Sequence, residues 1–138
     1  MTLHVELVVP EGRIWTGRAE RVIAKTLDGD IGVLTGHVPV LGVLSPGSLV
    51  RILPAGDEES RTAAAEVLAA VGGGFFSVAD DRVSILAQRA ELGSEIDRAT
   101  AQARLDAALE AAGGEGGEET VDVRHARAVL RAASGSQG

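Results

Sequence analysis

The chain has 138 residues and a formal net charge of −7, with hydrophobic residues at 45% and aromatic residues at 2%. This acidic balance argues against a nucleic-acid-binding protein, which needs a basic face, and the absence of cysteine excludes disulfides and thiolate metal sites. The length predicts one core, built from aliphatic side chains, with room for a small appendage.

The N-terminal stretch MTLHVELVVPEGRIW lacks the basic region, the long apolar run and the small-residue cleavage site of a secretory signal. No apolar run of the sequence approaches the roughly 20 residues of a membrane span. We therefore expect a soluble protein on the cytoplasmic side.

Residues 1–90 carry the pattern of short strands separated by turns. Apolar and β-branched runs such as LHVELVV, RVIAKTL, SLVRIL and DRVSILA alternate with segments rich in proline and glycine. Residues 61–71 favour helix by propensity, but three glycines follow at 72–74, so we expect the second half of this segment to be a strand. The pattern predicts an antiparallel β-sandwich or barrel.

Residues 91–138 change to a helical pattern. Ser94 is the expected N-cap of a first helix, with Glu95 and Asp97 in its first turn. Its apolar residues at helical spacing are Ala101, Leu105, Ala108, Leu109 and Ala112. A glycine-rich loop follows, and a second helix is expected to begin at Thr120. Its apolar side holds Val123, Ala126, Leu130 and Ala133. Because alanine buries little apolar area, this hairpin is expected to be able to detach from the sandwich.

The glycine-rich stretch DGDIGVLTGHVPVLGVLSPG, residues 28–47, contains one histidine. Histidine is a common general base in enzymes, but a general base also needs an orienting acid and a reacting group within reach, so a structural or interface role is the favoured interpretation for His37. The stretch completes no calcium loop, dinucleotide fingerprint or phosphate loop. Its alternation of glycine with aliphatic residues predicts a smooth apolar docking face instead.

Two motifs of this chain resemble the epsilon subunit of bacterial F-type ATP synthases. The run GDIGVLTGHVPVLGVLSPG is similar to the pattern Gly-acid-x-Gly-x-x-Pro-Gly-His-x-Pro of that family. The run GGFFSVADDRVSILAQRAE, residues 73–91, resembles Gly-Gly-Phe-x-x-Val…Val-x-Ile-Leu-Ala-x-x-Ala-Glu. The order of strands and helices fits over nearly the whole chain. The resemblance implies a β-sandwich of about ten strands followed by a C-terminal two-helix hairpin.

The resemblance also implies a noncatalytic rotor subunit of the proton-translocating ATP synthase. Such a subunit bridges the gamma subunit and the ring of c subunits, and it is peripheral to the cell membrane, with which it associates only through the complex. By the family match, Asp30 would meet the polar loops of the c ring, and Gly32, Gly36, His37 and Pro39 would shape the same loop. The alternative for Asp30 is a turn acid that bonds its own backbone.

The family's second role is regulation by the hairpin. It either folds against the sandwich or extends along gamma into the head of alpha and beta subunits, where it restrains ATP hydrolysis. Arg124, Arg127 and Arg131 lie within about 60° of arc on the second helix at 100° per residue. They would contact acidic segments of the beta subunits, or, with equal weight, form a solvated face.

Some members of the family bind ATP on this hairpin through an Ile/Leu-Asp-x-x-Arg-Ala motif. The corresponding residues here are Ile96, Asp97, Thr100 and Ala101. Thr100 replaces the arginine, and a hydroxyl group cannot supply the charged fork that grips phosphate. We therefore predict no cofactor and disfavour ATP sensing by this hairpin.

Two other classes of protein fit the sequence less well. A stand-alone β-sandwich that binds a small ligand usually supplies aromatic platforms, whereas this chain has only Trp15, Phe75 and Phe76. A small hydrolase needs a nucleophile, a base and an orienting group, and the sequence suggests no such set. The rotor subunit is the favoured interpretation.

Overall fold

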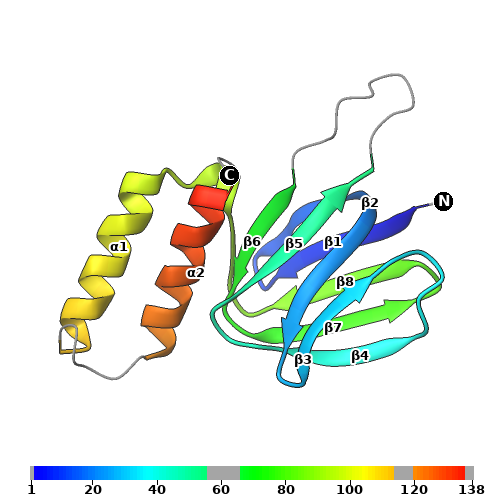
Figure 1. Ribbon diagram of the computed structural model, residues 1–138, viewed down its shortest axis with the longest axis horizontal. Helices are drawn as coiled ribbons and strands as arrows, with labels where there is room; N and C mark the ends of the chain where they lie inside the picture. The colour runs from blue at the N-terminus through cyan, green and yellow to red at the C-terminus, as the bar shows by residue number, and fades with distance from the viewer. Residues whose placement is uncertain (1, 56–65, 114–119, 136–138) are drawn as a thin grey trace.

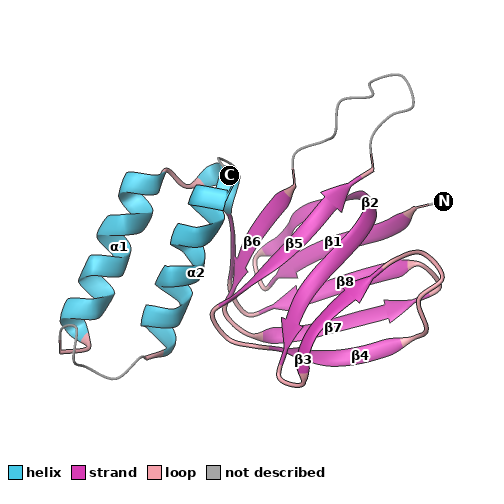
Figure 2. Cartoon of the chain, viewed as in Figure 1, coloured by secondary structure: helices cyan, strands magenta, loops and turns pink. Residues whose placement is uncertain are grey.

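The structure is a computed structural model that describes residues 2–55, 66–113 and 120–135. A strand-rich domain comes first and two helices follow, standing beside one another at one flank of the sheet (Figures 1 and 2). The predicted order of a β-sandwich followed by a two-helix hairpin is confirmed. The described residues form nine strands: β1 (Leu3–Val9), β2 (Gly12–Thr26), β3 (Gly29–Val33), β4 (Val40–Leu44), β5 (Ser48–Pro54), β6 (Val67–Val71), β7 (Gly74–Ala79), β8 (Arg82–Ala87) and β9 (Ala90–Leu92).

The strands follow the order β1-β8-β7-β4-β2-β5-β6-β9, with β3 beside β2 and a further pairing of β1 with β2. The 15-residue strand β2 pairs with β1 through its first half and with β3 and β5 through its second half, so it joins the two layers. One pairing departs from the antiparallel pattern that the sequence predicted. Strands β1 and β8 run parallel, which requires a long crossover, here the rest of the sandwich.

Alternation along the strands builds the aliphatic core. Phe76 is fully buried, whereas its neighbour Phe75 is 55% exposed, because successive side chains of β7 point to opposite faces. In β6, Ala69 and Val71 belong to the main core, and Ala70 between them faces the helices. The strand predicted for the second half of residues 61–71 is therefore confirmed, while residues 61–65 lie outside the described part of the chain.

The first helix begins later than predicted. Ser94 lies in a 3-10 turn, η1 (Gly93–Glu95), and Ile96 is extended, so the predicted cap at Ser94 is wrong. Helix α1 (Arg98–Ala111) is capped by Asp97, whose side chain accepts a hydrogen bond from the Ala99 N–H at 2.8 Å. The extended backbone at Ile96 lets its side chain pack beside Ala70 and the helices.

Helix α2 (Val121–Gly135) has the predicted cap, because the Thr120 hydroxyl accepts a hydrogen bond from the Val123 N–H at 3.2 Å. Most residues of the two predicted apolar stripes meet between the helices, in a cluster of Leu105, Ala108, Leu109, Ala112, Val123, Ala126 and Leu130. Ala101 and Ala133 of these stripes lie instead in the cluster that contains Ala70 of the sheet. A second side of α2 packs on the sandwich through Ala128 and Val129, so α2 lies between α1 and the sheet. Neither helix in the described part of the chain is long and apolar enough to cross a membrane.

Candidate functional site

The predicted interface residues fall mainly into two groups, Asp30 at the start of β3 and Gly36, His37 and Pro39 beyond its end, while Gly32 lies within the strand. Asp30 is exposed beside the tight turn from β2, where its cross-strand partner is Lys25. Gly36 and His37 lie in the turn after β3, which the His37 N–H closes by donating to the Leu34 carbonyl at 3.2 Å. At about 3.3 Å per strand residue, the two groups lie about 10 Å or more apart. The structure therefore presents two separate contact points rather than one.

A neighbouring hairpin holds the second of these points. The Gly36 N–H donates to the Asp81 carboxylate at 2.7 Å, and Gly36 itself has a φ of 81°. Asp80 and Asp81 form the β7–β8 turn with φ of 51° and 60°, a left-handed geometry that aspartate tolerates better than most residues. The turn thereby aims a carboxylate at the loop that carries His37, and sequence reasoning missed this role of Asp81.

We expect Asp81→Gly to loosen the loop that carries His37. Glycine keeps the left-handed turn but removes the carboxylate, so the Gly36 N–H loses a hydrogen bond worth about 0.5–1.5 kcal/mol. Amide exchange at Gly36 should become several-fold faster. Asp81→Asn is the control, because its side-chain carbonyl still accepts; equal exchange in the two variants would contradict the role of Asp81.

An apolar face covers the outer side of three neighbouring strands. It consists of Leu41 and Val43 of β4, Phe75 of β7 and Leu86 of β8. Val43 is the cross-strand partner of Phe75, and Phe75 is the partner of Leu86, so these three side chains form one row. Leu41 is 74% exposed, and large exposed apolar groups that gather on one surface mark a docking site.

The sequence predicted this apolar face only in part. Leu34, Val38, Leu41 and Val43 of the glycine-rich stretch are exposed as expected. Val33 and Leu44 of the same stretch point into the core instead. The contribution of β7 and β8 was not anticipated, because the pairing of β4 with β7 is a long-range feature.

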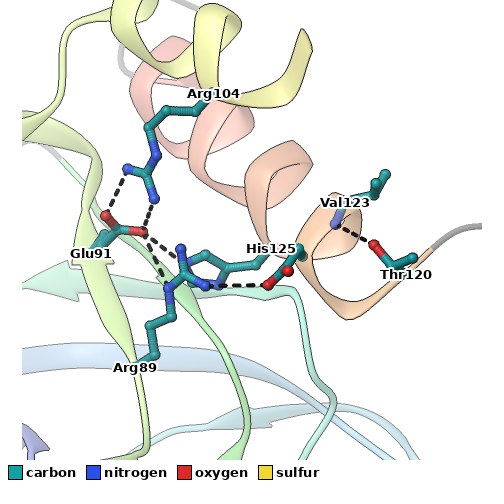
Figure 3. Close-up of polar contacts among 7 residues, drawn as sticks. Arg89, Glu91, Arg104, Thr120, Val123 and His125 are labelled. Atoms are coloured by element: carbon teal, nitrogen blue, oxygen red, sulfur yellow. Dashed lines mark hydrogen bonds and ion pairs between the residues drawn. The ribbon is translucent and has the colours of Figure 1, made fainter. Parts of the chain in front are cut away.

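A polar cluster fastens both helices to the end of the sandwich (Figure 3). Arg104 of α1 donates two hydrogen bonds to the Glu91 carboxylate of β9, at 2.7 and 2.9 Å. His125 of α2 lies 2.7 Å from the same carboxylate through Nε2. Arg89 adds ion pairs to Glu91 at 4.0 Å and to Asp122 at 3.8 Å. One carboxylate on the sheet thus binds both helices.

His125 is the most unusual member of this cluster, because its side chain is only 1% exposed. Burial lowers the pKa of His125, the hydrogen bond with Glu91 opposes this, and the net shift is downward. With neutral imidazole, Nε2 donates to Glu91, and Nδ1 has no hydrogen-bond partner among the described residues. In the sequence, the signal that could have pointed to this buried site is the lone histidine in the run RHARAV of the expected second helix.

Glu91 stays ionised in this setting. Burial on its own raises the pKa of Glu91, but the hydrogen bonds and charges of Arg104 and His125 outweigh it, and the net shift is downward. The cluster therefore combines an anionic carboxylate, a guanidinium group and a neutral imidazole across the boundary between sandwich and hairpin.

Two glycines let α2 approach the sandwich backbone. A Cβ at Gly47, in the β4–β5 turn, would lie 2.5 Å from the Arg124 Cβ. A Cβ at Gly93 would lie 2.5 Å from the Ala132 carbonyl carbon. Real Cβ atoms essentially never approach within 3.0 Å. The docked position of α2 therefore requires glycine at both positions.

Residues 2–93 match the family model for the ATP synthase delta/epsilon chain β-sandwich domain. This chain belongs to the ATP synthase delta/epsilon chain family. The resemblance drawn from the two sequence motifs is thereby confirmed. Membership makes the chain a noncatalytic stalk subunit of the ATP synthase complex, which is associated with a membrane, rather than a ligand-binding module or a hydrolase.

Relatives named ATP synthase epsilon chain match most of the sequence. The chain is 52% identical to that of Thermobifida fusca (strain YX), over 98% of this chain and 94% of the relative. It is 45% identical to that of Streptomyces avermitilis, over 88% of this chain and 91% of the relative.

Solved structures of low sequence identity share the fold. A chain of the Euglena gracilis mitochondrial ATP synthase, solved as OSCP/F1/c-ring, has a TM-score of 0.67 at 20% identity and is matched over 99% of this chain and 82% of that chain. A chain of the Tetrahymena thermophila mitochondrial central stalk and c ring has a TM-score of 0.53 at 18% identity, over 100% of this chain and 98% of that chain.

The residues at the family's ATP motif perform structural tasks here. Asp97 accepts hydrogen bonds from the Ala99 N–H at 2.8 Å and from the Thr100 hydroxyl at 2.6 Å, and these bonds lower the pKa of Asp97. Ile96 and Ala101 pack against the cluster beside Ala70. The contacts of Asp97 cap the start of α1, and those of Ile96 and Ala101 pack this region against the sheet. The absence of ATP binding remains a prediction.

Arg124, Arg127 and Arg131 gather along α2 around a groove that also contains Leu105 and Leu130. All three arginines are exposed while the hairpin is docked. Their predicted contact with a catalytic head remains a prediction, because the described residues belong to one chain with its hairpin folded against the sandwich.

Proposed function

We propose that this chain couples the gamma subunit to the c ring at the foot of the ATP synthase rotor, as a peripheral component on the cytoplasmic side of the membrane. The apolar face of Leu41, Val43, Phe75 and Leu86 is the observation that carries the proposal. An exposed apolar row on a rigid sheet suits a permanent protein partner, because such interfaces have apolar cores. Gamma is the partner assigned to this face.

The two contact points at the ends of β3 suit a different partner. Asp30 is exposed and His37 is partly exposed, both are polar, and neither belongs to the apolar face. They match polar loops better than an apolar surface, and we assign them to the c ring. The chains of similar fold from Euglena and Tetrahymena belong to assemblies that include the c ring, which supports the c ring as a partner.

The test of the gamma assignment is a charge on the apolar face. We expect Leu41→Glu to weaken binding to gamma by at least about thirtyfold, because Leu41 is the most exposed member of the face and anchoring interface residues contribute about 2 kcal/mol or more. The measurement is recovery of gamma with the tagged chain. Val121→Glu, which alters an exposed apolar residue on α2, is the matched control. Equal recovery of gamma with the two variants would contradict the assignment of gamma to the apolar face.

We further propose that the hairpin restrains ATP hydrolysis when it leaves the sandwich and reaches the alpha and beta subunits. Two features support a detachable element. The apolar cluster between α2 and the sheet consists largely of alanine, which gives a small area of contact, and the remaining attachment depends on the Glu91 cluster. Arg124, Arg127 and Arg131 would then meet acidic segments of beta.

A further inference from the structure

A cleft lies where α2 runs along the outer face of the sandwich. Its volume is about 450 Å³. The sheet side consists of the last residues of β2, Asp30 of β3, the turn at Pro46 and Gly47, and the start of β5. The helix side consists of Arg124 and Arg131, two turns apart on the same face of α2. The cleft therefore exists only while the hairpin is docked.

Positive charge converges on this cleft in a protein whose net charge is −7. Lys25 and Arg51 come from the sheet and Arg124 and Arg131 from the helix, whereas Asp30 is the one acid among the lining residues. Arg51 is paired with Glu66 at 3.0 Å. Lys25, Arg124 and Arg131 form no ion pair with any described residue. Cations held together without counter-charges raise the local concentration of anions.

The chemistry of the lining selects the kind of anion. Guanidinium groups present forked donors that match the oxygens of a phosphate, and lysine binds phosphate as a point charge. The walls between them combine Ser45 and Ser48 with glycine, proline and aliphatic residues. No aromatic side chain lines the cleft, so a nucleobase would find no stacking platform there. The contacts available are those to phosphate groups.

We propose that this cleft binds a phosphate-bearing anion, held by Lys25 and Arg51 of the sandwich and by Arg124 and Arg131 of α2. The ligand carries two or more negative charges, because each side of the cleft supplies two cations. It bridges the two parts of the protein, so its binding stabilises the docked hairpin by mass action. The cleft does not include Ile96, Asp97, Thr100 or Ala101, so it is a different site from the degenerate ATP motif.

The test uses the full chain with pyrophosphate as the probe, at physiological ionic strength. We expect saturable binding, followed by NMR shifts at Gly47 and along α2, together with slower amide exchange in α2. Lys25→Gln and Arg131→Gln should each weaken binding about tenfold or more, because each removes a charged hydrogen-bond donor. Arg98→Gln is the control; it removes the same charge from α1, outside the cleft.

A second arm separates a free phosphate compound from a lipid headgroup. Vesicles of phosphatidylcholine alone are compared with vesicles that also contain an anionic phospholipid. If pyrophosphate binds and Lys25→Gln weakens that binding, the result supports a soluble ligand. If only the anionic vesicles bind and Lys25→Gln weakens their binding, the result supports a lipid headgroup. Absence of binding in both arms overturns the proposal, and so does an equal loss in Arg98→Gln, which would indicate nonspecific attraction.

Discussion

Replacing Gly93 with alanine is expected to release the helical hairpin from the sandwich. The added methyl group would collide with the carbonyl group of Ala132 on α2, which is backbone and cannot rotate away. Overpacking of this kind costs about 1–3 kcal/mol, and here the cost falls on docking. Hydrogen exchange of the α2 amides is the measurement, and their protection should fall by about fivefold to a hundredfold.

Gly32→Ala is the matched control for this substitution. A Cβ at Gly32 would have no atom within 4 Å, so the same change of residue type should leave α2 protected. If the α2 amides still exchange slowly in Gly93→Ala, the helix can shift without detaching. The close approach of Gly93 to Ala132 would then not determine whether the hairpin docks.

The same variant tests the proposed restraint of ATP hydrolysis. In the assembled synthase, a hairpin released from the sandwich is free to reach the head, so Gly93→Ala should lower the rate of ATP hydrolysis several-fold. Assembly should remain intact, because Gly93 follows β9, which pairs with β6 and not with the strands of the apolar face. Loss of α2 protection with an unchanged rate of hydrolysis would rule out the hairpin as a brake.

Features governed by neighbouring residues could be predicted from the sequence. The alternation of apolar residues indicated the strands, and glycines at 72–74 indicated that residues 67–71 form a strand in spite of their helical propensity. The apolar stripes of the two helices were also correct, because a period of 3.6 residues determines which side chains meet. The two family motifs then indicated the complex to which the chain belongs, which the periodicity of apolar residues cannot show.

Features governed by distant residues could not be predicted. The sequence predicted a cap at Ser94, whereas α1 is capped by Asp97, and Ile96 before it packs in the cluster that contains Ala70. Nothing local connects Glu91 with His125, which lie 34 positions apart. The candidate interface shows the same limit, because Asp30 and His37 are close in sequence and yet lie at opposite ends of a strand.

Acidification is expected to detach the hairpin. The pKa of His125 is below its ordinary value of 6.5 in the docked state, because burial and the nearby charges of Arg89 and Arg104 outweigh the hydrogen bond and charge of Glu91. The docked state therefore holds fewer protons than the detached state below pH 6.5, and docking weakens as pH falls. The loss is at most about 1.4 kcal/mol per pH unit for one proton.

Glu91 extends the same trend to lower pH. Its pKa in the docked state is below the ordinary value of 4.5, so its contribution to docking is complete above that pH and is lost as pH falls through the docked pKa. Docking should therefore weaken in two steps with the same sign, first through His125 and then through Glu91. Exchange of α2 amides, corrected for intrinsic pH dependence, reports both steps.

His125→Gln separates the two steps. The glutamine amide can donate to Glu91 as the imidazole does but does not titrate, so the step that begins near pH 6.5 should disappear while the step below pH 4.5 remains. His4→Gln is the control, since His4 lies on the exposed side of β1 and should leave both steps unchanged. Persistence of the upper step in His125→Gln would assign it to another group, and the buried imidazole would then have no part in the pH response of the hairpin.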